Sequence, residues 1–160
     1  MRHFVRVLVA VTSLLTVSSF NALPSSAFVN TAESDKAFVE QELFATPLTT
    51  FVATANTSNN GDVWFDWKTD FCSAPFVGNT GRTFNFTEPC RRHDFGYRNS
   101  QLIDQRYATG YWNSTTRKRI DVQFLGDMKA HCSNRRIIDQ PTCYAWAYTF
   151  YNAVRVAGGP

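Results

Sequence analysis

The chain has 160 residues, of which 44% are hydrophobic and 18% charged, and its formal net charge is +3. This length favours a single domain with a modest hydrophobic core. The small net charge excludes the dense basic groove that a nuclease or another nucleic-acid-binding protein uses, so no nucleic-acid partner is expected.

The first 27 residues have the pattern of a secretory signal peptide. Basic residues precede an apolar run over residues 7–15, and Ser25 and Ala27 occupy the −3 and −1 positions of a small-x-small cleavage site. The apolar run is much shorter than the roughly 20 residues that a membrane-spanning helix needs. We therefore expect residues 1–27 to be removed and the mature protein to be secreted and extracellular.

The next section, residues 28–61, is expected to contain an N-terminal helix and a linker. Its first half has acidic residues early in a helical pattern, where the helix dipole favours them, and Pro47 ends this pattern. Residues 54–61 are polar and turn-rich, which is typical of a linker. The section is either a helix of the domain or part of a removed propeptide, and the lack of a Lys-Arg pair favours its retention.

Charge is distributed unevenly along the chain. Residues 28–62 carry one lysine against five carboxylates, whereas residues 63–160 carry an excess of basic residues. A basic body of this kind suits an anionic lipid surface better than it suits nucleic acid.

Four cysteines remain after the signal peptide, at positions 72, 90, 132 and 143. An even number of cysteines in a small secreted protein indicates two disulfides. Three pairings are possible, and Cys72–Cys90 with Cys132–Cys143 is favoured because each bond then closes a short loop. A zinc site is disfavoured because the chain has no CxxC spacing and no paired histidines.

The remaining residues, 62–160, are expected to form a mostly α-helical domain. Thr87 is expected to cap a helix that ends near Asp104. Apolar residues at helical spacing predict a second helix over residues 117–132, and an aromatic stripe predicts a third over residues 144–156. The predicted fold class is a small disulfide-stapled helical domain, in which two central antiparallel helices carry the active site.

Two side chains on these helices form a candidate catalytic pair. His93 lies inside the first helix, while Asp121 falls on the apolar stripe of the second. A buried carboxylate is costly unless it is paired, and a histidine N–H from a neighbouring helix is its simplest partner. Such a pair orients an imidazole as a general base. The alternative is an Asp121 that lies at the helix edge in water. The other mature histidine, His131, is interpreted as a structural or surface residue.

Two further aspartates are candidate ligands for a calcium ion, which prefers several hard oxygen ligands. Asp94 directly follows His93, and Asp70 lies in a loop next to Cys72. If Cys72 pairs with Cys90, this loop is brought to the start of the His93 helix. Asp70 and Asp94 then converge, and a loop carbonyl can add a further ligand.

Residues 89–99, with the sequence PCRRHDFGYRN, resemble the active-site helix of the bacterial and fungal secreted phospholipases A2. Further matches occur in the same order at residues 65–72, 119–121, 127–129 and 145–148, so that the resemblance covers about residues 63–157. The chain lacks the glycine-rich calcium loop and the many disulfides of the animal secreted enzymes.

The resemblance implies a role for each candidate residue. His93 corresponds to the base that activates water, and Asp121 to its partner. Calcium ligands correspond to the carboxylates of Asp70 and Asp94 and to the carbonyl of Phe71. Residues 62–160 then form a phospholipase A2 catalytic domain, which hydrolyses the sn-2 ester of glycerophospholipids.

The implied substrate is a phospholipid membrane or micelle surface, and a monomer is expected. The alternative is a secreted membrane- or receptor-binding effector that uses the same scaffold with little turnover. A pure binding protein has no need of all four of the side chains that match the catalytic and calcium-binding positions. The chain contains no Gly-x-Ser-x-Gly motif, so no covalent serine mechanism is implied. Three Asn-x-Ser/Thr sequons, at Asn56, Asn85 and Asn113, are potential glycan sites.

Overall fold

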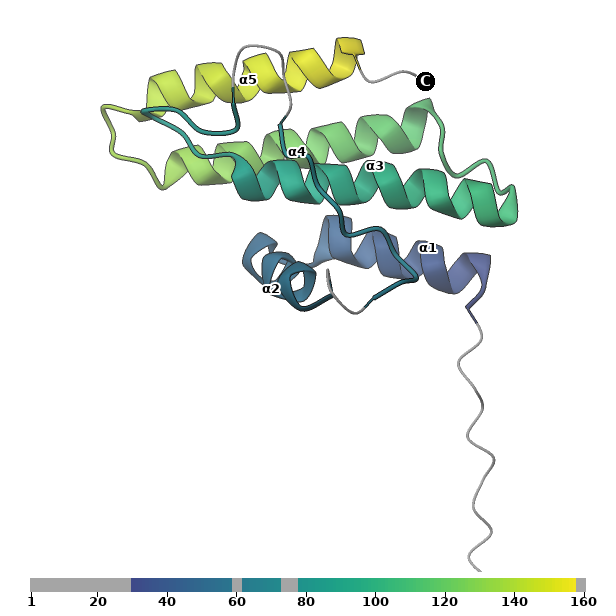
Figure 1. Cartoon of the computed structure of the whole chain (residues 1–160). Coiled ribbons are helices and arrows are strands. Elements are labelled where there is room, and N and C mark those ends of the chain that lie inside the picture. The colour runs from purple at the N-terminus through teal and green to yellow at the C-terminus, as the bar shows by residue number, and fades with distance from the viewer. Residues whose placement is uncertain (1–29, 59–61, 73–77, 158–160) are drawn as a thin grey trace, which may run out of the picture.

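The computed structural model describes residues 30–58, 62–72 and 78–157 (Figure 1). Its elements are α1 (Ala32–Glu40), the π-helical segment η1 (Gln41–Ala45), α2 (Leu48–Ser58), α3 (Thr87–Tyr107), α4 (Ser114–Ser133) and α5 (Gln140–Ala157). Within the described ranges, the only β-type pairing is an isolated bridge between Thr80 and Asn85. The predicted mostly α fold is therefore confirmed. No helix in the described part of the chain is long and apolar enough to cross a membrane. The expected signal peptide lies outside the described residues.

The helices form three layers (Figure 1). α3 and α4 run antiparallel through the middle of the molecule, with α5 along α4 on one side and α1, η1 and α2 on the other. Ala108 ends α3 in a left-handed conformation, with φ 51°, and Asn113 starts α4 by accepting hydrogen bonds from the N–H groups of Thr115 and Thr116. This short connection brings the two central helices back alongside each other, as the sequence predicted.

Two apolar clusters fill the spaces between these layers. The first joins α1, η1 and α2 to α3 and contains Val39, Leu43, Phe51, Ala55, Trp67, Phe95, Ile103, Tyr111 and Ile120. The second joins α4 and α5 to the start of α3 and contains Phe84, Phe86, Cys90, Phe124, Met128, Cys132, Cys143, Ala147 and Phe150. The central helix pair is therefore held from both faces, which fixes the side chains that lie between α3 and α4.

Both predicted disulfides are formed. Cys72–Cys90 has a Cα–Cα distance of 5.4 Å and ties the preceding loop to the first turn of α3. Cys132–Cys143 has a Cα–Cα distance of 5.5 Å and joins the end of α4 to the start of α5. Loops of this length are expected to contribute about 3 kcal/mol each to the free energy of unfolding.

The front section differs from the sequence-based expectation. Residues 54–58, predicted as linker, belong to helix α2. Phe51 and Ala55 lie one helical turn apart and are both almost fully buried, so tertiary contacts outweigh the polar composition of this segment. The rest of the predicted linker, residues 59–61, lies outside the described residues.

The start of α3 also differs from the expectation. Thr87 is the first helical residue and not the cap, because Phe86 occupies the N-cap position. The backbone N–H of Thr87 donates to the side chain of Asn85 at 3.1 Å, which supplies the acceptor that Thr87 was expected to provide.

Gly96 marks the closest approach of α3 to its neighbours. A Cβ atom at this position would lie 2.8 Å from Leu43 Cδ2 and 2.9 Å from Ile120 Cγ2, and both of these side chains are buried. We expect Gly96→Ala to lower the free energy of unfolding by about 1–2 kcal/mol through overpacking.

Gly126 provides the matched control, because it is an exposed helical glycine whose added Cβ would meet no atom within 4 Å. We expect Gly126→Ala to raise the free energy of unfolding by about 0.5–1 kcal/mol through helix propensity. Urea denaturation measures the free energy of unfolding of both variants. Equal changes in this free energy would contradict the close packing at Gly96.

Candidate active site

The centre of the candidate site is a contact between α3 and α4. His93 Nε2 lies 2.8 Å from Asp121 Oδ1. The Asp121 side chain is fully buried, whereas the His93 side chain is 10% exposed. The imidazole packs between the rings of Tyr97 and Phe124, with ring centroids 4.3 and 4.7 Å away. The structure therefore brings together the two residues that the sequence singled out as a pair, with Asp121 buried and not at a solvated edge.

Asp121 has further partners that sequence reasoning missed. The Tyr97 hydroxyl donates to Oδ1 at 2.7 Å, and Arg155 Nη1 donates to Oδ2 at 2.6 Å. Arg117 Nε lies 3.9 Å from Oδ2 and donates to the Tyr97 hydroxyl at 3.2 Å. Burial by itself favours the neutral acid, but the hydrogen bonds from His93, Arg155 and Tyr97 hold the pKa of Asp121 below its ordinary value. The group is therefore an ionised carboxylate at neutral pH.

Tyr97 acts as a permanent hydrogen-bond donor in this network. Burial raises the pKa of its hydroxyl, and the hydrogen bond to the Asp121 carboxylate raises it further. Tyr97 follows His93 by one helical turn, a spacing that was visible in the sequence. Arg155 reaches Asp121 from the C-terminal turn of α5, a proximity that no local pattern indicates.

The orientation of the imidazole decides which nitrogen can accept a proton. Because Nε2 faces Asp121, that nitrogen carries the hydrogen when the ring is neutral. Nδ1 is then the basic nitrogen of the ring. This is the arrangement that a general base needs, since the buried carboxylate fixes the tautomer and stabilises the protonated ring.

Next to His93, the loop before Cys72 closes over the carboxylate of Asp94. Asp94 Oδ2 accepts hydrogen bonds from the Thr69 hydroxyl at 2.5 Å and from the N–H groups of Asp70 and Phe71 at 3.2 and 3.1 Å. Phe71 takes a left-handed conformation with φ 58°, which costs a non-glycine residue about 1–2 kcal/mol. The contacts to Asp94 hold the loop in this strained form. Thr69 was not identified from the sequence.

The donor set at this loop fits a hard cation. Burial raises the pKa of Asp94 to about 6; the Thr69 hydrogen bond opposes this shift, and the negative charge of nearby Asp70 adds to it. A cation bound here would relieve the repulsion between these two carboxylates, and both carboxylates would supply it with hard oxygen ligands. The Asp70 side chain is exposed and accepts a hydrogen bond from Arg98 at 3.3 Å.

Within the described ranges, no three His, Cys, Asp or Glu side chains gather into a metal-binding group. Main-chain carbonyls, such as that of Phe71, and water would complete the six to eight oxygens that calcium takes.

Comparison with known proteins identifies the family of the chain. Residues 39–158 match the family of prokaryotic phospholipases A2. The secretory phospholipase A2 of Beauveria bassiana is 34% identical over 138 residues, which cover 86% of this chain and 66% of that protein. The secretory phospholipase A2 of Arthroderma benhamiae is 29% identical over 150 residues, which cover 91% of this chain and 95% of that protein. The match confirms the resemblance seen around His93: the chain belongs to the prokaryotic phospholipase A2 family, a family of ester hydrolases.

Proposed function

We propose that this chain is a secreted, calcium-dependent phospholipase A2 that cleaves the sn-2 ester of glycerophospholipids into a fatty acid and a lysophospholipid. The observation that carries the proposal is the contact between His93 Nε2 and the buried Asp121 carboxylate, on a helix whose next residue, Asp94, binds the loop of Asp70 and Phe71. Family membership supports phospholipid hydrolysis. The residue roles, the calcium requirement and the position of cleavage are parts of the proposal.

His93 is the general base in this mechanism. Its Nδ1 takes a proton from a water molecule, whose oxygen bonds to the ester carbonyl carbon. The bond from this carbon to the glycerol oxygen then breaks, and the imidazolium returns the proton to that leaving oxygen. Asp121 holds the Nε2–H tautomer and stabilises the imidazolium that forms, while Tyr97 and Arg155 keep the carboxylate in place. General-base catalysis of this kind contributes about 10²–10⁴-fold to the rate.

The calcium site is formed by the carboxylates of Asp70 and Asp94 with the carbonyl of Phe71. An ion bound there supplies a Lewis acid for the ester carbonyl oxygen and its developing negative charge. Thr69 orients Asp94 by its hydrogen bond to Oδ2, and the carboxylate of Asp94 would supply oxygen to the cation.

The organisation of the chain follows from the same proposal. Residues 1–27 are a removed signal peptide, and residues 62–160 form the catalytic domain. Two relatives that carry the name secretory phospholipase A2 support secretion. The substrate is presented by a phospholipid membrane or micelle surface, at which the enzyme acts as a monomer.

The first test is fatty acid release from phosphatidylcholine vesicles, with calcium and then with excess chelator. We expect sn-2 release that requires calcium and that falls by about 10²–10⁴-fold in His93→Ala, because the base is lost. His131→Ala is the matched control, since this histidine contacts Phe86 and the N–H of Asn85 away from the site, and it should retain most of the activity. Equal activity of the two variants would reject His93 as the base. A folded wild-type protein that releases no fatty acid would favour the membrane- or receptor-binding effector.

The second test concerns Asp121. We expect Asp121→Asn to lower kcat by about 10²–10⁴-fold, because an amide neither fixes the tautomer nor stabilises the imidazolium. The variant should also change the acid dependence of stability. The pKa of Asp121 is lowered in the folded protein, so its contribution to stability is present above about pH 4 and is lost as the pH falls through the folded-state pKa.

Urea denaturation between pH 7 and pH 2.5 measures this contribution. The free energy of unfolding of Asp121→Asn should be lower at neutral pH and should fall less steeply below about pH 4 than that of the wild type. Glu33→Gln is the control, because Glu33 is an exposed carboxylate on α1, and it should follow the wild-type curve. Parallel curves for Asp121→Asn and the wild type would show that the Asp121 carboxylate is not stabilised by folding.

A further inference from the structure

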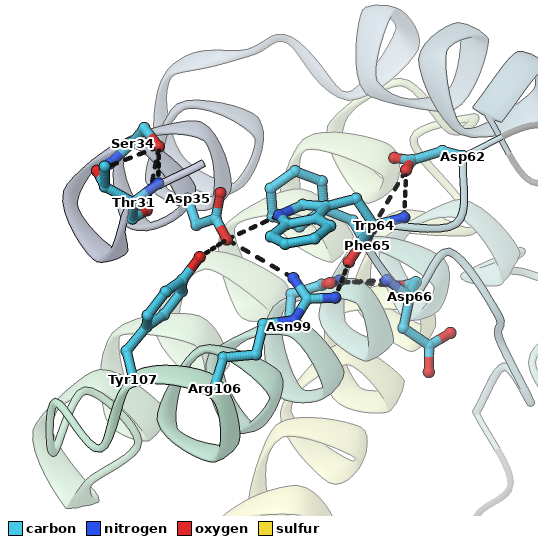
Figure 2. Close-up of polar contacts among 10 residues, drawn as sticks. All are labelled: Thr31, Ser34, Asp35, Asp62, Trp64, Phe65, Asp66, Asn99, Arg106 and Tyr107. Carbon is cyan, nitrogen blue, oxygen red and sulfur yellow. Dashed lines mark hydrogen bonds and ion pairs between the residues drawn. The ribbon is translucent and has the colours of Figure 1, made fainter. Parts of the chain in front are cut away.

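We propose that Asp35 is a positioning residue for the calcium site, and that helix α1 uses it to fix the segment over residues 62–71 that carries Asp70 and Phe71. This inference rests on the proposed function, because it concerns the same site. Asp35 itself touches neither a candidate ligand nor the catalytic pair. Its contact with the segment is made through Trp64, whose indole N–H donates to Asp35 (Figure 2).

Asp35 is a buried carboxylate with two hydrogen-bond donors and one ion-pair partner. Its side chain is 2% exposed, and Oδ2 accepts hydrogen bonds from Trp64 Nε1 at 2.8 Å and from the Tyr107 hydroxyl at 3.0 Å. Arg106 Nη1 lies 3.6 Å from the same oxygen. Figure 2 shows the donors converging on this carboxylate from the segment of Trp64 and from the end of α3. A buried charge is tolerated only when such partners are in place, so α1, α3 and the segment share one fixed arrangement.

Trp64 is held at several points by this cluster. Besides the bond from its indole N–H to Asp35, its backbone carbonyl accepts a hydrogen bond from Arg106, whose guanidinium carbon lies 4.1 Å from the centre of the indole ring. Trp64 is 36% exposed, so hydrophobic burial alone does not determine its position. Instead, the position of Trp64 is set by the charge of Asp35. This carboxylate binds the indole N–H directly and holds the guanidinium of Arg106 beside the ring.

The backbone after Trp64 is fixed at short intervals up to the site. Asp62 accepts from the N–H of Trp64 at 2.7 Å and from the indole N–H of Trp67, also at 2.7 Å. Asn99 of α3, which is fully buried, pairs with both the N–H and the carbonyl of Asp66 at 2.8 Å. From Thr69 onward, the chain is bound to Asp94. These consecutive contacts connect Trp64 to the loop of Asp70 and Phe71, and on this inference a shift at Trp64 displaces both residues.

Helix α1 is itself held in a defined position. Thr31 and Ser34 form a reciprocal capping box, which starts the helix at Ala32, three residues before Asp35. One turn further on, Phe38 stacks on Phe65 with ring centroids 4.5 Å apart. The helix thus contacts the segment by an apolar ring and by a buried charge. On this inference, residues 30–58 are retained beside the catalytic domain in the working enzyme and are not a removable propeptide.

The test compares Asp35→Asn with the wild-type protein in two measurements, calcium binding by calorimetry and vesicle hydrolysis at increasing calcium concentration. We expect both the dissociation constant for calcium and the calcium concentration at half-maximal rate to rise about 10-fold, as is typical when a residue that orients metal ligands is removed. The kcat at saturating calcium should stay within about twofold of wild type, because His93 and Asp121 are untouched.

Trp64→Phe provides a second route to the same result, since it keeps a six-membered aromatic ring and removes the pyrrole ring with the N–H that donates to Asp35. Its calcium dissociation constant should also rise. The dissociation constant of the double variant with Asp35→Asn should be no higher than that of the single variant with the larger effect.

Two controls separate positioning from general destabilisation. Glu33→Gln changes an exposed carboxylate on the same helix and should leave calcium binding unchanged. Phe150→Leu weakens the second apolar cluster, which contains none of residues 62–71, and should lower the melting temperature without weakening calcium binding.

The inference is overturned if Asp35→Asn and Trp64→Phe bind calcium like the wild type, or if Phe150→Leu weakens calcium binding as much as they do. A wild-type protein that hydrolyses vesicles without binding calcium overturns both the inference and the calcium part of the proposed function. If the wild-type protein binds calcium and the Asp35 and Trp64 variants bind it equally well, only the inference is overturned.

Discussion

The buried carboxylate of Asp121 is the constraint on which the rest of the structure depends. It lies on α4 between α3 and α5, where an unpaired charge would be strongly destabilising. His93 and Tyr97 reach it from α3 and Arg155 reaches it from α5, so the three helices take the one arrangement that satisfies this charge. The same requirement that holds the helices together gives the imidazole a fixed tautomer. Packing and chemistry therefore have a common cause at this position.

A second buried carboxylate organises the opposite side of the molecule. Asp35 binds groups from the end of α3 and from the segment that leads to Asp70, and the disulfide Cys72–Cys90 ties that segment to the start of α3. Between these two anchors, the main chain binds Asn99 and then Asp94. The loop that is proposed to hold calcium is thus attached to one rigid helix along its length. Such preorganisation is what a site with few protein carboxylates needs in order to bind a hard cation.

Conclusions about this enzyme rest on two kinds of support. Membership of the prokaryotic phospholipase A2 family rests on a match that spans most of the chain. The roles of His93, Asp121, Asp94, Asp70 and Phe71 rest on geometry and on the motif, and they remain proposals. In the proposed mechanism the base is Nδ1 of His93, whose Nε2 faces Asp121, and the oxygen bound by the loop is Oδ2 of Asp94.

The sequence by itself determined the features that depend on local spacing. Helical periodicity located the three long helices, short loops between cysteines identified both disulfides, and a carboxylate on an apolar stripe singled out Asp121 as the partner of His93. Only the tertiary structure decided the remainder. Arg155 and Asp35 are remote in the chain from the groups that they hold, and no spacing rule connects such residues. The second half of α2, residues 54–58, was predicted as linker because its polar residues favour a turn, whereas in the structure Phe51 and Ala55 are buried and the segment is helical. Local patterns specify elements, whereas a buried charge is satisfied by whichever residues the packing of those elements brings to it.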